Sequence, residues 1–338
     1  MTNMDKNTIE KLFTDFTKLK VLVIGDVMID SYIYGRVDRI SPEAPVPIVL
    51  VEKRENRLGG AANVALNVQS LGATPILCSV VGDDLKGEEF IELLADNGIS
   101  PVGILRSSKR ITTTKFRIIG NNYQMLRVDE EHGHSLYDNE TEVFMKRIKK
   151  LISTEKPSVI IFEDYDKGVI NEKLITWTIE LANAENIPLV VDPKKKNFKH
   201  YKNITLFKPN FKELCEGLEI EHVSKDIKSL TKICKPFQKQ HNIAMMLLTM
   251  SEHGVFVSKQ ETNSTLTTEI IPAQIRNIAD VSGAGDTVIS IAALCLALQL
   301  SVHDIAFISN IGGGLVCETV GVIPIDKKRL MNELINAK

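Results

Sequence analysis

The stretch Asp280-Val-Ser-Gly-Ala-Gly-Asp286-Thr287, followed by the apolar run 288–300, predicts a glycine-containing turn that leads into a buried helix. Ser282 has the side chain of a good helix N-cap. The glycines at 283 and 285 allow bare backbone N–H groups to approach a ligand closely. Those amides and the positive end of the helix dipole would form a site for a phosphate or a developing negative charge.

Asp286 falls in the first turn of this predicted helix, where a carboxylate is favoured and could reach a hydroxyl held over the helix end. Transfer of a phosphoryl group to an alcohol requires this combination, because the amides hold the transferring charge while the carboxylate accepts the hydroxyl proton. The simpler alternative is an ordinary glycine turn with an acidic first helical residue. The octet alone leaves both open.

The rest of the chain alternates between apolar strand-like runs and helical segments. Strands joined by helices predict a mostly parallel, doubly wound sheet. No repeat, low-complexity tract or linker divides residues 1–338, so we expect a single domain. After a polar leader helix in 1–20, strands are predicted near 21–25, 75–82, 158–162, 188–192, 204–207 and 244–249, and helices near 58–71, 85–97, 139–153, 171–186, 223–240 and 302–319.

Two segments, at about 31–58 and 111–129, do not follow this order of strands and helices, because both contain further strand-like runs in which apolar and polar residues alternate. Within the second, the turn Gly120-Asn-Asn122 separates two strand-like runs and predicts a β-hairpin. Two excursions of strands from one α/β body suggest a small sheet that covers the site as a lid.

Composition excludes several classes of protein. A net charge of -2 with 25% charged residues gives no excess of positive charge of the kind that binds nucleic acid or an anionic membrane. The polar start does not resemble a secretory signal, and the longest apolar run is too short to span a bilayer. The five cysteines are scattered, which favours reduced thiols in a cytoplasmic enzyme over disulfides or zinc; they are Cys78, Cys215, Cys234, Cys295 and Cys317.

Polar residues follow several predicted strands at the edge where open α/β sheets bind ligands. Asp26 and Asp30 follow the first strand, although Asp26 has an alternative role as a turn or cap residue. The pair Gly59-Gly60 permits close backbone approach to a ligand or, alternatively, close helix packing. Asn63 offers a donor and acceptors to sugar hydroxyls.

Three further residues would suit the phosphates of a nucleotide. Asn210 and Glu213 could present an amide and a carboxylate to Mg²⁺ or its waters, but the same spacing fits an N-cap with a capping-box glutamate. Lys194 could contact phosphate, or it could lie in a solvated loop.

The predicted lid hairpin carries three cations, Lys115, Arg117 and Arg127. Cations on a lid would suit an acceptor that already carries a phosphate. Basic residues on an exposed strand also serve as ordinary edge protection, so this alternative stays open.

At this point the motifs match a known family. Gly59-Gly60-Ala-Ala-Asn63-Val-Ala65, with Gly72 and Gly82, resembles the first signature of the ribokinase-like (PfkB) carbohydrate kinases, and 280–287 resembles the second. Asn210-Phe-Lys-Glu213 resembles their Asn-x-x-Glu motif. The resemblance covers nearly the whole chain from about Val21. It implies a three-layer α/β/α sandwich with a mostly parallel sheet and a small β-sheet lid, which commonly forms the dimer interface.

Within the family, the stretches 25–30, 39–47 and 280–286 resemble the kinases that phosphorylate D-glycero-D-manno-heptose 7-phosphate at C1 during ADP-heptose synthesis for lipopolysaccharide. Those kinases often occur fused to a nucleotidyltransferase domain. Since this chain ends near the kinase boundary, we expect no second Rossmann-like domain. One departure is that relatives more often have small residues in place of Glu163 and Asp166.

The resemblance also implies roles for individual residues. Asp286 would be the base, and the amides of Gly283, Ala284 and Gly285 would be the anion hole. Mg²⁺ would bind at Glu213, directly or through water, and a monovalent cation is a further option. The remaining positions are Asp30, Gly59, Gly60 and Asn63 for the sugar, Lys115, Arg117 and Arg127 for its phosphate, and Asn210, Glu213, Lys194, Thr249, Ser251, Gly254, Asn310 and Gly314 for ATP.

These observations predict a cytoplasmic, ATP-dependent sugar-phosphate kinase that forms a homodimer through its lid. Two alternatives remain. One is a kinase of the same family for ribose, fructose or fructose 6-phosphate. The other is a non-catalytic sugar- or nucleotide-binding module on the same fold, which would have no need of the base Asp286.

Overall fold

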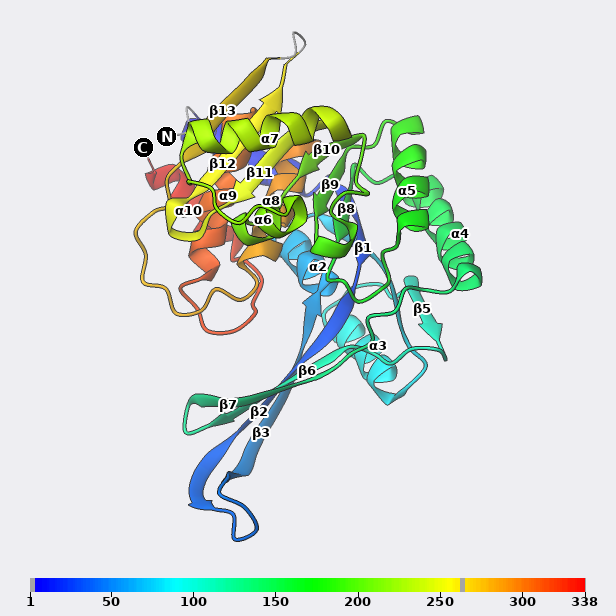
Figure 1. Cartoon of the computed structure of the whole chain (residues 1–338), viewed down its shortest axis with the longest axis vertical. Coiled ribbons are helices and arrows are strands. Elements are labelled where there is room, and N and C mark those ends of the chain that lie inside the picture. Colours follow the sequence, from blue (N-terminus) through cyan, green and yellow to red (C-terminus); the bar gives the residue numbers. More distant parts are fainter. Residues whose placement is uncertain (1–3, 262–264, 338) are drawn as a thin grey trace.

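The computed structural model describes residues 4–261 and 265–337, and a nine-stranded sheet forms the centre of this part of the chain (Figure 1). Its strand order is β13-β12-β11-β10-β9-β8-β1-β4-β5. All neighbours from β11 to β5 pair in parallel, while β12 and β13 are antiparallel additions at one edge. The strands are β1 (Lys20–Gly25), β4 (Thr74–Gly82), β5 (Gly103–Ser107), β8 (Val159–Glu163), β9 (Leu189–Asp192), β10 (Ile204–Phe207), β11 (Ile243–Thr249), β12 (Val255–Gln260) and β13 (Leu266–Ile271).

Helices cover both faces of this sheet, so the body has three layers (Figure 1). The helices α1 (Lys6–Phe16), α2 (Ala61–Ser70), α3 (Leu85–Asp96), α8 (Ala284–Ala297), α9 (Val302–Val316) and α10 (Lys327–Asn336) contribute to one buried cluster. The helices α4 (Asp138–Glu155), α5 (Glu172–Ala184), α6 (Phe211–Leu218) and α7 (Ile227–His241) contribute to the other.

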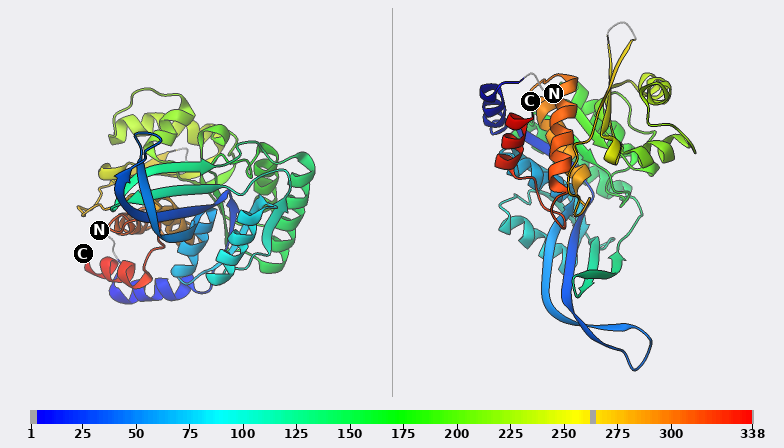
Figure 2. Two further views of the ribbon diagram at one scale, coloured as in Figure 1. Left: turned by 90° about the horizontal axis from the view of Figure 1, so that it is seen from below. Right: turned by 90° about the vertical axis from the view of Figure 1, so that its left-hand side faces the viewer.

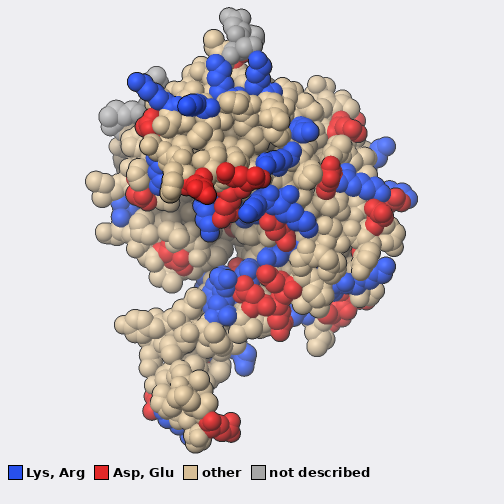
Figure 3. Space-filling view, viewed as in Figure 1, with Lys and Arg blue, Asp and Glu red and all other residues tan. Residues whose placement is uncertain are grey.

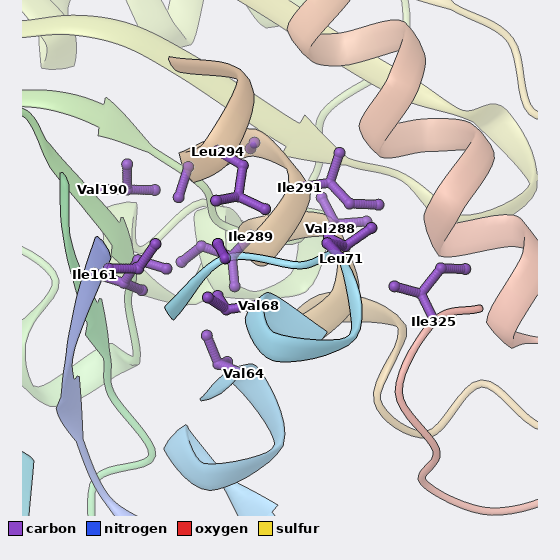
Figure 4. Close-up of a cluster of buried hydrophobic side chains, with 14 of the residues drawn as sticks. Val64, Val68, Leu71, Ile161, Val190, Val288, Ile289, Ile291, Leu294 and Ile325 are labelled. Atoms are coloured by element: carbon purple, nitrogen blue, oxygen red, sulfur yellow. The ribbon is translucent and has the colours of Figure 1, made fainter. Parts of the chain in front are cut away.

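Residues of the central strands alternate between the two clusters. Val21 and Val23 of β1 face the α2–α8 layer, while Leu22 and Ile24 face the opposite one. Strands that are buried on both faces read as continuous apolar runs, which explains why they could be predicted. Figure 4 shows the first cluster, where side chains of α2, α8, β8 and β9 meet.

The segments predicted to leave the body form a separate four-stranded sheet with the order β3-β2-β6-β7, which we call the projecting sheet. It extends away from the body in Figure 1 and in the right-hand view of Figure 2. Asn121 and Asn122 both have positive φ, 52° and 66°, so they form the tight turn expected between β6 and β7. The strands are β2 (Val27–Ile40), β3 (Pro47–Gly60), β6 (Thr114–Gly120) and β7 (Tyr123–Glu130).

The two faces of the projecting sheet differ in character. Asp30 and Tyr32 of β2 pair with Lys115 and Arg117 of β6, and these side chains share the inner face, toward the body. The opposite, outer face carries apolar residues, which include Phe116, Ile118, Leu126 and Val128.

Some sequence expectations were wrong. Ser282 is not the N-cap of α8, because Gly283 occupies that position with φ of 80°. The strand β5 and the helix α10 were not predicted, and α9 ends at Val316 rather than near 319. The five cysteines are free, as expected. Within the described ranges no helix has the length and apolar character needed to cross a bilayer.

Candidate active site

The N-terminus of α8 is the centre of the candidate site. Gly283 turns the chain with φ of 80°, a backbone conformation that residues with a side chain rarely adopt. Helix α8 begins at the next residue, Ala284. The first-turn amides of a helix have no partner within the helix, so this end attracts anions. The amide of Ala284 has only a long bond, 3.3 Å to the carbonyl of Val281. The predicted anion-hole residues Gly283, Ala284 and Gly285 therefore lie together at the helix end.

Asp286 lies in the first turn of α8 and is only 5% exposed. Its Oδ2 accepts a hydrogen bond of 2.6 Å from Nδ2 of Asn63, and its Oδ1 accepts one of 2.7 Å from the hydroxyl of Tyr165. Burial raises the pKa of Asp286 to about 6, although these two hydrogen bonds act in the opposite direction. A carboxylate with this pKa is well suited to act as a base near neutral pH.

Three residues at the ends of neighbouring strands lie beneath α8. Glu163 ends β8, Asp192 ends β9 and Lys208 follows β10. Each lies two residues after a member of the α8-side core cluster, namely Ile161, Val190 and Leu206, so all three side chains point toward α8.

Lys208 and Asp192 form a buried ion pair of 2.7 Å. A Cβ atom added at Gly285 would lie 3.6 Å from Nζ of Lys208 and 3.7 Å from Oδ2 of Asp192, so the pair lies directly against the predicted anion hole. Burial disfavours the charge on Lys208, but Asp192 and Glu213 outweigh it and raise its pKa. Sequence reasoning missed Lys208, although its position directly after the predicted strand 204–207 was a usable signal.

Lys194 connects this ion pair to the Asn-x-x-Glu motif. Its Nζ contacts Glu213 Oε1, lies 3.9 Å from Asp192 Oδ1 and lies 5.2 Å from the centre of the Tyr165 ring. Burial would lower the pKa of Lys194, but the two carboxylates raise it. The side chain is thus held at the sheet edge, not extended into a solvated loop.

Asn210 and Glu213 form a capping box at the start of α6, which is one of the two alternatives that the sequence left open. Asn210 Oδ1 accepts from the Glu213 amide at 2.9 Å, and Glu213 Oε2 accepts from the Asn210 amide at 2.8 Å. Since Lys194 contacts the other oxygen, neither oxygen of Glu213 lacks a partner.

The residues expected to hold the sugar lie where β2, β3 and α2 meet. Asp30 is buried and pairs with Arg117 at 2.5 Å. Gly59 lies so close to Asp30 that a Cβ atom there would clash with its carboxylate, and Gly60 has φ of 61° at the N-cap of α2. Asn63 follows in the first turn of that helix and reaches Asp286.

The other lid cations already have carboxylate partners. Lys115 lies 3.2 Å from Asp129 and 3.4 Å from Glu131, and Arg127 lies 3.0 Å from Asp129. Lys115 is largely buried, whereas the Arg127 side chain is 53% exposed. Acidic and basic residues lie side by side where the body meets the projecting sheet, next to a hollow (Figure 3).

Arg57 and Tyr32 were not predicted from the sequence, yet they complete the inner face of the projecting sheet. The guanidinium carbons of Arg57 and Arg117 lie 4.8 and 5.2 Å from the centre of the Tyr32 ring. Arg57 also lies against Gly321 and Val322, and Val322 lies against Gly283. The signal available in the sequence was the basic run around Arg57, immediately before the glycine pair.

The loop after β8 is held by Asp26. Its carboxylate accepts hydrogen bonds from the amides of Tyr165, Lys167 and Val169 at 3.0, 3.1 and 2.9 Å. Asp26 is buried, and its contacts are those of a residue that stabilises a turn, which is one of the two roles that the sequence left open. The three bonds fix the loop that brings Tyr165 to Asp286.

The residues expected to bind the nucleotide lie on two segments, 249–254 and 310–314, and each segment contacts Pro272. Thr249 pairs with Asn210, and Gly254 packs against the backbone of Ile271 and Pro272. Asn310 donates to the Pro272 carbonyl at 2.9 Å. The last two members are Ser251, with φ of 54° at a short 3₁₀ turn, and Gly314, where a Cβ atom would lie 3.0 Å from Nε of Arg276.

Residues 18–329 match the family model described as pfkB family carbohydrate kinase. The chain belongs to this family. Its fold agrees with that assignment: phosphofructokinase-2 from Escherichia coli, in a crystal structure with potassium, superimposes with a TM-score of 0.76 over 94% of this chain and 99% of that chain at 17% identity. A ribokinase from Arabidopsis thaliana, complexed with ribose and ATP, gives a TM-score of 0.68 at 13% identity, with 93% and 98% covered. The predicted ribokinase-like α/β fold is therefore confirmed.

Curated relatives are more similar in sequence. Bifunctional protein HldE of Methylobacillus flagellatus is 37% identical over 93% of this chain, and that of Helicobacter pylori strain J99 is 38% identical over 89%. The chain spans 63% of the length of each of these two relatives. The remaining part of each bifunctional protein is not aligned with this chain. Family membership makes the chain a carbohydrate kinase and implies that it uses ATP.

Proposed function

We propose that the chain transfers the γ-phosphoryl group of ATP to C1 of D-glycero-D-manno-heptose 7-phosphate, which gives the 1,7-bisphosphate for ADP-heptose and lipopolysaccharide core synthesis. The observation that carries the chemistry is the buried Asp286 in the first turn of α8, beside the first amides of that helix. Support for the sugar comes from the similarity to bifunctional protein HldE over most of this chain.

In the proposed reaction the C1 hydroxyl oxygen attacks the γ-phosphorus, and the bond from that phosphorus to the bridging oxygen of ADP breaks. Asp286 accepts the hydroxyl proton, and ADP leaves with the bond's electron pair. The amides of Gly283, Ala284 and Gly285, with Lys208 beside them, stabilise the transferring charge. Asn63 and Tyr165 hold the carboxylate in position through their hydrogen bonds.

ATP would lie along the segment that includes Thr249, Ser251, Gly254, Asn310 and Gly314, with its phosphates toward Lys194 and Asn210. Mg²⁺, when bound, neutralises phosphate charge. No group of three or more metal-ligating side chains occurs among the residues described, so Mg²⁺ would take most of its ligands from water and phosphate oxygens, as it usually does. Glu213 would hold it through water, since both of its carboxylate oxygens already accept hydrogen bonds.

The sugar would lie between Asp30, Gly59, Gly60 and Asn63, with its 7-phosphate toward the inner face of the projecting sheet. Lys115, Arg117 and Arg127 are the proposed phosphate ligands. Each has a carboxylate partner in the absence of sugar, so phosphate binding would exchange that partner for a phosphate oxygen. The side-chain exposures favour Arg117 and Lys115 over Arg127 as the main contributors.

The proposed assembly is a cytoplasmic homodimer in which the projecting sheets pack through their outer faces. Many large apolar side chains of this sheet are exposed, and a monomeric protein rarely exposes so many in one region. Over both faces of the sheet they are Ile40, Leu50, Val51, Tyr123, Met125, Leu126 and Val128, of which Leu126 and Val128 lie on the outer face.

The test is ADP release with a panel of acceptors: heptose 7-phosphate, fructose 6-phosphate, fructose and ribose. We expect kcat/KM to be highest for heptose 7-phosphate, and ³¹P NMR of the product to show a second phosphate at C1. A preference for an unphosphorylated sugar would overturn the proposed substrate. No ADP release with any acceptor would favour a non-catalytic binding module.

A further inference from the structure

The loop after β8 carries a cation to which the proposed reaction gives no role. Lys167 follows Tyr165 by two positions, and its Nζ lies 2.8 Å from Oε1 of Glu131, the residue after β7 of the projecting sheet. The Nζ of Lys115, on the inner face of that sheet, lies 3.4 Å from Oε2 of the same glutamate. One carboxylate therefore holds two ammonium groups, one from the body and one from the projecting sheet.

The backbone of Lys167 is held at this junction independently of the ion pair. Its amide donates to the carboxylate of Asp26 at 3.1 Å, and its carbonyl oxygen accepts from the guanidinium of Arg110 at 2.5 Å. Both of these partners are buried. The pair between Lys167 and Glu131 is partly exposed to water, and such pairs contribute little to stability. Its carboxylate can therefore be exchanged for another anion without loss of the fold.

Positive charge is in excess along this series of ion pairs. Glu131 lies between Lys167 and Lys115, and Asp129 lies between Lys115 and Arg127, so three cations share two carboxylates. Burial disfavours the charge on Glu131, but the hydrogen bond with Lys167 and the charges of both lysines outweigh it and lower its pKa. The ionised glutamate thus occupies a place that suits an anionic ligand.

This place borders the proposed sugar site. Lys115 is the register partner of Asp30 in the parallel pair of β2 and β6, so the two side chains are neighbours on the inner face. The loop of Lys167 also carries Tyr165, whose hydroxyl donates to Asp286. A sugar held between Asp30 and Asp286 therefore has the two lysines at the edge of its site.

We propose that Lys167 determines specificity for the acceptor: together with Lys115, it binds the phosphate that the sugar already carries. This inference rests on the proposed function. Glu131 holds the two ammonium groups before the sugar binds, and the phosphate then takes its place, because two phosphate oxygens have nearly the same spacing as two carboxylate oxygens. A phosphate monoester carries nearly two negative charges at neutral pH, so it is the stronger partner for the two lysines.

The experiment is a calorimetric titration of the nucleotide-free protein with D-glycero-D-manno-heptose 7-phosphate and with the same heptose without its phosphate. We expect Lys167→Gln to weaken binding of the phosphorylated sugar at least about tenfold, the effect of losing a charge-assisted hydrogen bond, and to leave binding of the other sugar unchanged. Lys173→Gln, at an ion-paired and partly exposed lysine of α5, is the matched control and should bind both sugars as the unaltered chain does. Thermal unfolding shows that each variant folds.

The variant Glu131→Gln distinguishes a phosphate ligand from a purely structural ion pair. Glu131→Gln and Lys167→Gln both break the contact between these residues, but only the second removes a phosphate ligand. We therefore expect Glu131→Gln to bind the phosphorylated sugar at least as tightly as the unaltered chain does, since a competing anion is gone. Equal weakening by both substitutions would overturn the proposal, as would an equal loss for both sugars, or no loss, in Lys167→Gln.

The kinase assay can fail separately from this titration. Turnover of heptose 7-phosphate, with unchanged sugar binding by Lys167→Gln, would overturn this inference alone. Sugar binding that depends on Lys167, without any release of ADP, would overturn the proposed catalysis alone. An unaltered chain that binds neither sugar would overturn both.

Discussion

The hydroxyl of Tyr165 lies 2.7 Å from Oδ1 of Asp286, so the loop after β8 donates a hydrogen bond to the proposed base at the start of α8. The base must be ionised to accept a proton, and its pKa is about 6. We therefore expect kcat/KM to fall below about pH 6 and to level off above it. A pH–rate profile at subsaturating sugar measures this limb. A profile that stays flat down to pH 5 would contradict the assignment of Asp286.

Replacing Tyr165 by Phe should move this limb to higher pH. The hydrogen bond from Tyr165 favours the ionised form of Asp286, so its loss raises the pKa of that carboxyl. At pH 8 the variant should retain most of its activity, whereas at pH 6 it should lose more than the unaltered chain does. A uniform loss at every pH would indicate that Tyr165 acts on substrate instead.

Replacing Asp286 by Asn should lower kcat by about 10²–10⁴ and leave ATP and sugar binding nearly unchanged, because the base acts in the transition state. Rapid-quench kinetics and calorimetric titration would separate turnover from binding. Asp96→Asn, at an exposed residue of α3, is the control. Turnover that survives in Asp286→Asn would require a different base.

Replacing Arg117 by Gln should raise the KM for a phosphorylated sugar by about 10- to 100-fold, the expected effect of losing a charge-assisted hydrogen bond. The KM for ATP should stay unchanged. Arg127→Gln should have a smaller effect, because its side chain is half exposed and its interactions are screened by water. Equal losses with a sugar that lacks the phosphate would mean that Arg117 serves only to orient Asp30.

Replacing Leu126 and Val128 together by Glu should convert the proposed dimer to a monomer. Both side chains are exposed on the outer face of the projecting sheet, at 54% and 42%. Buried there, two carboxylates would lack partners and oppose association. Light scattering after size-exclusion chromatography gives the mass directly. A monomeric unaltered chain, or a doubly substituted chain that stays dimeric, would rule out this interface.

The buried part of the fold could be predicted because its pattern is local. Strands such as β8 and β10 are continuous apolar runs, and the turn Asn121-Asn122 has a known preference. The strand β5 escaped prediction because it is short and mixes polar with apolar residues. Helix α10 had a readable signal in Asp326 as N-cap and the buried Leu330 and Leu334, which were overlooked.

The candidate site was harder to predict, because its contacts join distant parts of the chain. Glycines and Asp286 are visible as a motif, but the bond from Asn63 to Asp286 spans 223 positions and depends on how α2 packs on α8. Tyr165 became recognisable only once its loop lay beside α8, whereas the position of Lys208 directly after a predicted strand was a signal that was overlooked. The choice between a capping box and a metal ligand at Glu213 likewise depended on the location of Lys194.

Only Asp26 separates β1, in the body, from β2, in the projecting sheet. Its carbonyl oxygen accepts the Ala61 amide at the start of α2, its amide donates to the Glu163 carbonyl, and its carboxylate holds the loop of Tyr165. Asp26 is thus one of the points at which the projecting sheet is joined to the body; the ends of β3, β6 and β7 are the others. Since the same residue fixes the loop that brings Tyr165 to the proposed base, a substitution that loosens Asp26 is expected to disturb both the root of the projecting sheet and the hydrogen bond to Asp286.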